Sequence, residues 1–98
     1  MNKPINWFEI PVADLERAQR FYEATFAIDM QREDMGPLRM ALFPYAEPAT
    51  GGALLACPEA RPGDHGVVIY LDGGADLAVP LARAVAAGGT VLMPKTEL

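Results

Sequence analysis

Cysteine and histidine are nearly absent from this sequence, which contains one of each, Cys57 and His65. A single cysteine excludes an intramolecular disulfide, and Cys57 has no Cys or His neighbour at zinc-finger spacing. The lone thiol fits a reducing compartment, so we expect a cytoplasmic protein. His65 lies in the loop-like run Arg61–His65, where we expect a surface position.

Long apolar runs and an excess of positive charge are also missing. No stretch approaches the roughly 20 apolar residues of a membrane helix, and the N-terminal run Met1–Trp7 does not resemble a signal peptide. Eight basic residues against thirteen acidic ones give a formal net charge of −5, with no basic stripe. Because such a charge repels phosphate backbones, we expect neither nucleic acid nor a membrane as a partner.

Apolar residues, by contrast, are plentiful. They make up 51% of the 98 residues, and 21% are charged. A chain of this size and composition can bury one hydrophobic core without help from a metal or a disulfide. We therefore expect a single domain over residues 1–98.

The first half of the chain predicts one helix among four strands. Trp7–Val12 reads as a β-prone run, and Asp14 can cap the helix that follows. In Leu15–Phe26, apolar residues recur at spacings of three and four, which predicts an amphipathic helix. Three strand candidates, separated by turn residues, follow around Asp29–Asp34, Arg39–Pro44 and Gly52–Cys57. The predicted order is βαβββ.

The same order begins again in the second half. Val67–Leu71 reads as a buried strand, Asp76-Leu77 opens a second helix, and Thr90–Met93 begins another strand. Pro80 removes an early helical hydrogen bond, so this helix either has a loosened first turn or begins later than Asp76. The sequence thus predicts an α+β fold with module one at about 5–58 and an incomplete module two at about 66–98. Open strand edges invite association, so we expect a homodimer.

These features resemble a known superfamily. The segment Trp7–Tyr22, with its pattern Trp-Phe-Glu-Ile-Pro-Val-x-Asp-Leu-x-Arg-Ala-x-x-Phe-Tyr, is similar to the glyoxalase, bleomycin-resistance and dioxygenase (vicinal oxygen chelate) superfamily. Residues 51–54, 68–74 and 86–96 look like its subgroup of predicted enzymes related to lactoylglutathione lyase. The resemblance implies paired βαβββ modules whose sheets line a ligand cleft.

The resemblance also implies where metal ligands would stand. Trp7 occupies the place of the first histidine ligand, Val68 lies near that of the second, and the third site falls within Ala53–Ala56. The fourth would lie beyond Leu98. Indole and aliphatic side chains do not ligate a divalent ion, so we expect no metal and no other cofactor.

Four residues are the candidates for a ligand site. Strand alternation directs Phe8 and Ile10 to the helix and leaves Glu9 at the cleft mouth, as a general base or a solvated carboxylate. Trp7 is either a ligand-stacking platform or a packing residue. The other two candidates are Tyr70, whose phenol can meet a ligand, and Asp72, which alternatively serves the turn before Gly73.

The sequence therefore predicts a protein that binds a small molecule in a sheet-lined cleft without metal. Whether it is also catalytic stays open. One alternative is a metal-dependent lyase or dioxygenase related to lactoylglutathione lyase, with Glu9 as its base and the missing ligands supplied from elsewhere. A second is a drug-sequestering dimer of the resistance type, and a third is a relative without any ligand.

Overall fold

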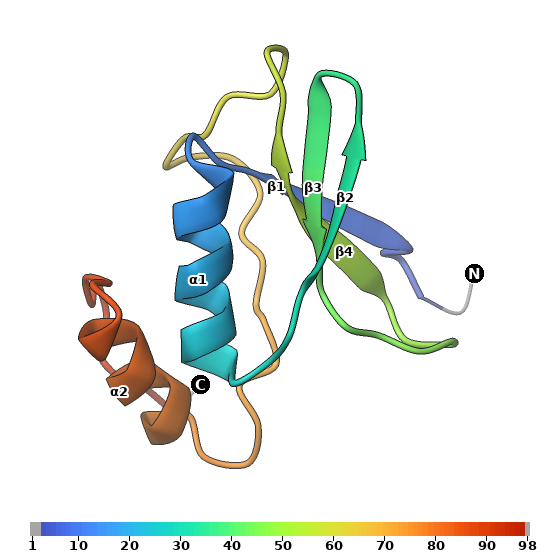
Figure 1. Cartoon of the computed structure of the whole chain (residues 1–98). Coiled ribbons are helices and arrows are strands. Elements are labelled where there is room, and N and C mark those ends of the chain that lie inside the picture. Colours follow the sequence, from blue (N-terminus) through green and yellow to red (C-terminus); the bar gives the residue numbers. More distant parts are fainter. Residues whose placement is uncertain (1–2, 98) are drawn as a thin grey trace.

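The computed structural model describes residues 3–97, so the outermost positions of the predicted domain, residues 1, 2 and 98, lie outside the described part. Four strands and two helices form in this order (Figure 1): β1 (Trp7–Pro11), α1 (Leu15–Phe26), β2 (Gln31–Met35), β3 (Leu38–Leu42), β4 (Gly51–Ala56) and α2 (Ala78–Ala86). The α+β fold class is confirmed, and the first module has the predicted βαβββ order. No helix in the described part is long and apolar enough to cross a membrane.

Helix α1 forms where its sequence pattern predicts it. The Asp14 carboxylate accepts a hydrogen bond of 3.1 Å from the Arg17 backbone N–H, which satisfies one of the unpaired donors of the first turn. The helix ends at Phe26, and the capping residue Ala27 has a φ of +53°, in the left-handed region. Leu15 is 2% exposed and anchors the apolar face of α1 on the sheet.

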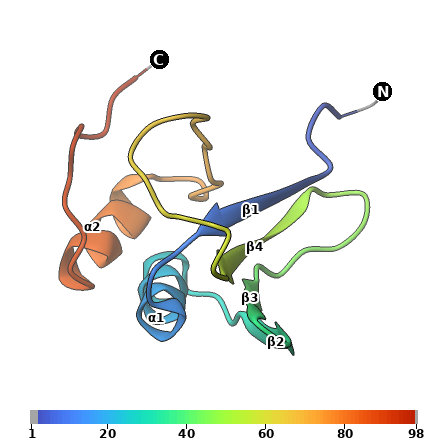
Figure 2. The ribbon, with the colours of Figure 1, turned by 90° about the horizontal axis from the view of Figure 1, so that it is seen from above.

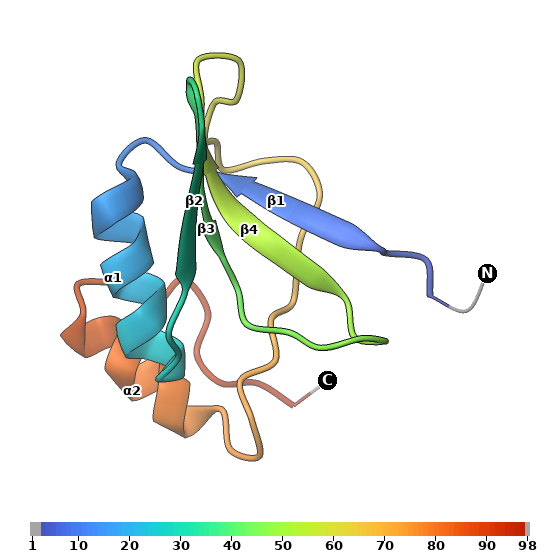
Figure 3. The same ribbon diagram turned by 45° about the vertical axis from the view of Figure 1, so that its right-hand side comes forward.

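The sheet has the strand order β1-β4-β3-β2, with β1 parallel to β4 and the other neighbours antiparallel. Both helices lie on one side of it (Figures 2 and 3). Helix α1 packs on β3 and β4, whereas α2 packs on α1. The main core cluster is formed between α1 and the sheet by Leu15, Met30, Ala41 and Leu54.

In the described part of the chain, the opposite face of the sheet carries no helix. A second, smaller cluster of buried residues lies there, made of Met40, Ala53 and Leu55. Because side chains alternate along a strand, Glu9, which is paired with Ala53, belongs to this open face, whereas Ile10, paired with Leu54, faces α1. The predicted orientation of the apolar side chains of β1 toward the helix is thus confirmed.

Aromatic rings cover the two glycines that begin β4. A Cβ atom added at Gly52 would lie 2.3 Å from Phe8 Cε1, and one added at Gly51 would lie 2.5 Å from Tyr45 Cε1. Both distances are too short for a side chain, so each ring occupies the space that a Cβ atom would need. The Gly-Gly pair therefore determines where Phe8 and Tyr45 pack.

The second module differs from the prediction in its strands. Val67–Leu71 and Thr90–Met93 are not strands, and Val67, Val68 and Tyr70 are 90%, 73% and 82% exposed. A strand is stabilised by backbone hydrogen bonds to a neighbour. Within residues 3–97, no such bond reaches Val67–Leu71. The β-propensity of these segments alone does not produce a strand.

Helix α2 shows how the chain accommodates Pro80. The helix begins at Ala78, so Pro80 lies in the first turn, where a missing N–H costs little. Asp76 still accepts a hydrogen bond of 3.0 Å from the Ala78 N–H, just before the helix. Of the two sequence-based alternatives, the later start is the one observed. Gly88, with a φ of +99°, follows the end of α2 in the left-handed conformation that favours glycine.

Ionic contacts join α1 to the neighbouring strands. The Glu16 carboxylate accepts a hydrogen bond from the Arg39 guanidinium of β3 and lies 3.6 Å from Arg32 Nη1 of β2. Arg32 Nη2 also donates to Gln19 Oε1 at 2.7 Å. The hydrogen bond from Arg39, with further contributions from a backbone hydrogen bond and from both positive charges, lowers the pKa of Glu16 to about 2.

This lowered pKa predicts an acid-dependent loss of stability. Since the ordinary pKa is 4.5, Glu16 stabilises the fold above about pH 4.5, and this contribution disappears as the pH falls through 2. We expect Glu16→Gln to unfold at lower urea concentration than the unmodified protein at neutral pH, with the difference vanishing near pH 2. Because the contact is exposed, salt should weaken it.

Carboxyl-carbon NMR of Glu16 provides the direct measurement. Arg39→Gln is the matched variant, because it removes the strongest partner and should move the titration back toward the ordinary range. A Glu16 titration that is identical with and without Arg39 would contradict the assignment.

Candidate functional site

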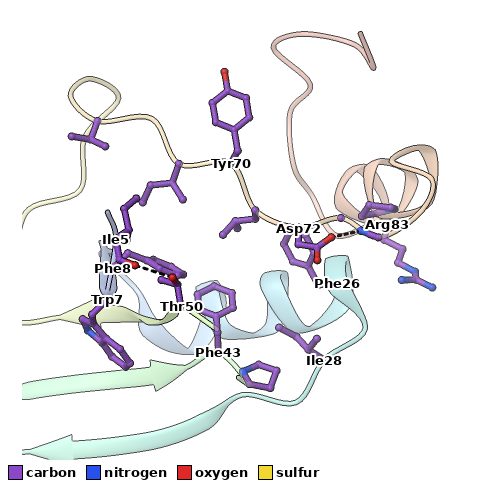
Figure 4. A pocket seen from close by; sticks show the side chains of 17 residues that line it. Ile5, Trp7, Phe8, Phe26, Ile28, Phe43, Thr50, Tyr70, Asp72 and Arg83 are labelled. Carbon is purple, nitrogen blue, oxygen red and sulfur yellow. Dashed lines mark hydrogen bonds between the residues drawn. The ribbon is translucent and has the colours of Figure 1, made fainter. Parts of the chain in front are cut away.

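A groove of about 900 Å³ lies beside β1, between the sheet and the extended segment 67–74. Figure 4 shows its walls, which come from the start of β1, the end of α1, the β3–β4 connection, segment 67–74 and α2. The lining residues are Ile5, Trp7, Phe8, Phe26, Ile28, Phe43, Pro44, Thr50, Val67, Ile69, Tyr70, Leu71, Asp72, Gly73, Gly74, Pro80 and Arg83. Small-molecule sites commonly measure about 300–1,000 Å³, so the groove has room for a drug-sized ligand.

Aromatic rings dominate the sheet side of the groove. The Phe8 and Phe43 rings have centroids 5.5 Å apart and are tilted by 45°. Phe43 in turn meets Tyr22 of α1 edge to face at 5.7 Å. Burial raises the pKa of Tyr22, so its phenol stays neutral behind the rings. These contacts hold the floor rings in place and provide an apolar surface for a planar ligand.

Polar groups lie at the two ends of the groove. At one end, Thr50 Oγ1 donates a hydrogen bond of 2.8 Å to the Ile5 carbonyl and ties the entry of β1 to the start of β4. At the other end, the Asp72 carboxylate accepts a hydrogen bond of 2.9 Å from the Gly74 N–H, and Arg83 of α2 lines the same end (Figure 4). One negative and one positive group therefore lie at the same end of an otherwise apolar groove.

The structure brings three of the four sequence-predicted site residues to this groove. Trp7, Tyr70 and Asp72 line it, although Tyr70 is 82% exposed and its ring points away from the other lining side chains (Figure 4). Asp72 also forms the turn contact that was its alternative role. Glu9 is not among the lining residues. It lies on the open sheet face, where Trp7 Nε1 donates to its Oε2 at 3.2 Å. Its proposed role as a base stays a prediction.

Sequence reasoning missed the aromatic floor and Arg83. Strand alternation directs Phe8 to the helix side of β1, and Phe26 ends the predicted helix Leu15–Phe26, yet both line the groove. No sequence pattern identified Phe43 as a candidate site residue. These apolar residues line a groove, rather than lying in the core, because segment 67–74 is positioned opposite their rings.

The family-type metal site does not fit these residues. Among the residues that the structure describes, Asp72 is the only carboxylate that lines the groove. The indole N–H of Trp7 is a donor engaged with Glu9. Within residues 3–97, no three His, Cys, Asp or Glu side chains lie close enough together to hold an ion. His65 is exposed, with its Nδ1 3.4 Å from Asp64, and Cys57 is half-buried against the smaller core cluster.

Comparison with known protein families identifies a match in the first half of the chain. Residues 5–43 match the model of a family described as bleomycin resistance protein-like N-terminal. This segment runs from the start of β1 through β3 and covers less than half of the chain. The match supports a relationship to the glyoxalase and bleomycin-resistance superfamily. No curated protein matches the chain significantly.

Proposed function

We propose that this chain is a glyoxalase- and bleomycin-resistance-like protein that binds a small, ring-bearing molecule in the groove without a metal. The observation that carries this proposal is the fixed pair of Phe8 and Phe43 rings in a groove of drug-like size. Offset ring stacking on such a floor gives both burial of apolar surface and an orientation preference. The Asp72 and Arg83 end would receive a polar or charged substituent of the ligand.

Binding is favoured over chemical transformation by the position of Glu9. A general base must lie within hydrogen-bond reach of the proton that it removes. Glu9 is on the open sheet face and its carboxylate contacts Trp7, so a ligand on the aromatic floor would not meet it. The lyase and dioxygenase alternatives also need metal ligands, and the described residues provide no group of three.

Sequestration of a drug-like molecule is the form of binding that the family match favours. The matched family is described by its likeness to bleomycin resistance proteins, and the matched segment supplies several groove residues, among them Phe8, Phe26, Ile28 and Phe43. Sequestration requires affinity alone, which an aromatic floor can provide. These observations support the proposal that the chain is a binding protein of the resistance type.

Ligand titrations followed by the fluorescence of Trp7, the single tryptophan, test the proposal. Planar aromatic drugs and dyes should change the emission and raise the melting temperature, since they bind the folded state. We expect Ile5→Ser, which removes an apolar wall, to weaken binding by roughly threefold to tenfold. Met35→Ser is the matched control, because Ile5 and Met35 are 53% and 52% exposed and Met35 lies on β2, away from the groove.

Two outcomes would contradict the proposal. One is that no planar aromatic compound shifts either the emission or the melting temperature. The other is that Ile5→Ser and Met35→Ser weaken binding equally, which would locate the ligand outside the groove. Binding that requires added zinc, nickel or iron would instead favour the metal-dependent alternative.

A further inference from the structure

A second hollow, of about 790 Å³, lies between α1 and the turn that follows α2, and we call it the interhelical crevice. Helix α2 runs beside α1 (Figures 1 and 2). Residues of α1 between Arg17 and Ala24 form one wall, and Ala87, Gly88 and Gly89 form the other. The crevice shares no lining residue with the groove beside β1, and its volume is in the range of small-molecule sites.

The α1 wall of the crevice combines positive charge with aromatic surface. Arg17, Arg20, Phe21 and Ala24 follow one another at intervals of three and four residues, so they share one face of the helix. Phe21 is half-buried, and so is Tyr22, which also lines the crevice. Two guanidinium groups therefore lie beside apolar rings.

The carboxylates of α1 lie on another face of the helix and already have partners. Glu16 accepts a hydrogen bond from Arg39 and lies 3.6 Å from Arg32 Nη1. Glu23 Oε2 accepts a hydrogen bond of 2.9 Å from the Met30 N–H. Within residues 3–97, the two arginines of the crevice form no ion pair with these or other acidic groups. Their positive charge is thus not neutralised by the protein.

The end of α2 does not need these arginines as a cap. The Ala87 N–H donates to the Arg83 carbonyl at 2.9 Å, and the Gly89 N–H donates to the Ala84 carbonyl at 2.8 Å. A Cβ atom added at Gly89 would lie 2.9 Å from the Ala84 oxygen and 3.0 Å from Phe21 Cε1. The glycine therefore allows the turn to close against the Phe21 ring, which fixes this wall of the crevice.

We propose that the interhelical crevice is a second small-molecule site and that it takes a planar organic anion, such as an aromatic carboxylate. Arg17 and Arg20 would bind the anionic group, because a guanidinium donates paired hydrogen bonds to a carboxylate. The rings of Phe21 and Tyr22 provide apolar surface for the body of the ligand. In a chain with a net charge of −5, an anion needs a local positive charge that is not neutralised, and these arginines provide it.

Amide NMR shifts during a titration with 2-naphthoate test the proposal. The matched ligand is 2-naphthamide, because it has the same rings and nearly the same shape without the negative charge. We expect 2-naphthoate to shift the amide signals of residues 17–24 and 87–89, and 2-naphthamide to leave them unchanged at the same concentration. Since the attraction is between exposed charges, added salt should weaken the binding of 2-naphthoate.

Arginine variants test the charge contact itself. The double variant Arg17→Gln, Arg20→Gln removes charge-assisted hydrogen bonds and should weaken the binding of 2-naphthoate by roughly tenfold or more. Arg61→Gln is the matched control, because Arg61 is also exposed, forms no ion pair in the described part of the chain and lies outside the crevice. All three arginines are exposed, so the fold should be retained, which far-ultraviolet circular dichroism checks.

Three outcomes would overturn the proposal. The first is that 2-naphthoate shifts none of the crevice amides, and the second is that 2-naphthamide shifts them equally. The third is that the double variant and Arg61→Gln bind 2-naphthoate equally well. Binding in the groove beside β1 is followed separately at Trp7 and segment 67–74, which the crevice does not include. Failure of the groove proposal would therefore leave these results unchanged.

Discussion

Replacing Leu54 by alanine should lower the free energy of unfolding by about 3 kcal/mol. Leu54 is fully buried in β4, an inner strand of the sheet, and its neighbours in the register are Ile10 on β1 and Ala41 on β3. It belongs to the core cluster that joins the sheet to α1. The truncation removes buried methyl groups and leaves a cavity that a packed strand cannot close.

Urea unfolding followed by circular dichroism measures this effect. Leu92→Ala is the control with the same chemistry, because Leu92 is 94% exposed and its truncation should change the free energy by no more than about 0.5 kcal/mol. A small domain has a modest total stability, so Leu54→Ala should be partly unfolded at elevated temperature. Equal effects of the two truncations would show that Leu54 is not in the core.

A methyl group at Gly52 should destabilise the fold by about 2 kcal/mol and impair ligand binding at the same time. The added Cβ would lie 2.3 Å from Phe8 Cε1, far inside contact distance. Phe8 is held by Phe43, which is held by Tyr22, so the ring has little freedom to move away. Gly52→Ala should therefore displace the aromatic floor of the groove and weaken binding by roughly tenfold.

Gly51→Ala is the matched control, since the same atom is added one residue earlier in the same strand. There the Cβ would meet Tyr45, whose side chain is 48% exposed and can turn into solvent. We expect this variant to lose less stability and to retain ligand binding. Thermal unfolding and Trp7 fluorescence titration compare the two. Normal binding by Gly52→Ala would argue against the aromatic floor as the ligand site.

Local signals predicted the first module well. Asp14 caps α1 as expected, because a helix cap involves residues only three apart in sequence. The strand candidates at Asp29–Asp34, Arg39–Pro44 and Gly52–Cys57 correspond to β2, β3 and β4 with ends shifted by one or two residues. A two-residue turn joins β2 to β3 and an eight-residue connection joins β3 to β4, so each strand meets an antiparallel partner that is close in sequence.

The second module shows where local reasoning stops. The run Val67–Leu71 consists entirely of residue types that favour strands, yet it forms no strand and its first four residues are exposed. The residue types of the segment favour a β conformation. A strand, however, also needs a second backbone at hydrogen-bonding distance. The sequence of the segment does not specify whether such a partner strand is present.

The candidate site could also be predicted only in part from the sequence. Residue type and alternation pointed to Trp7, Tyr70 and Asp72, and the first two of these lie 63 residues apart (70 − 7) in the sequence. The same reasoning also proposed Glu9, which the groove does not include. Alternation tells which strand face a side chain occupies, but not where along that face, or at which edge, a hollow opens.

The amino-acid sequence alone determined the α+β class, the βαβββ order of the first module, the capped helix and the helix-facing side of β1, because short-range spacing and side-chain type control each of them. Only the tertiary structure decided that Phe8 and Phe43 form the floor of the groove, that Arg83 lines its Asp72 end, and that Val67–Leu71 has no backbone partner in the described chain. These features depend on which distant segments pack together. The contacts that form them join residues far apart in the sequence, so the spacing of neighbouring residues does not specify them.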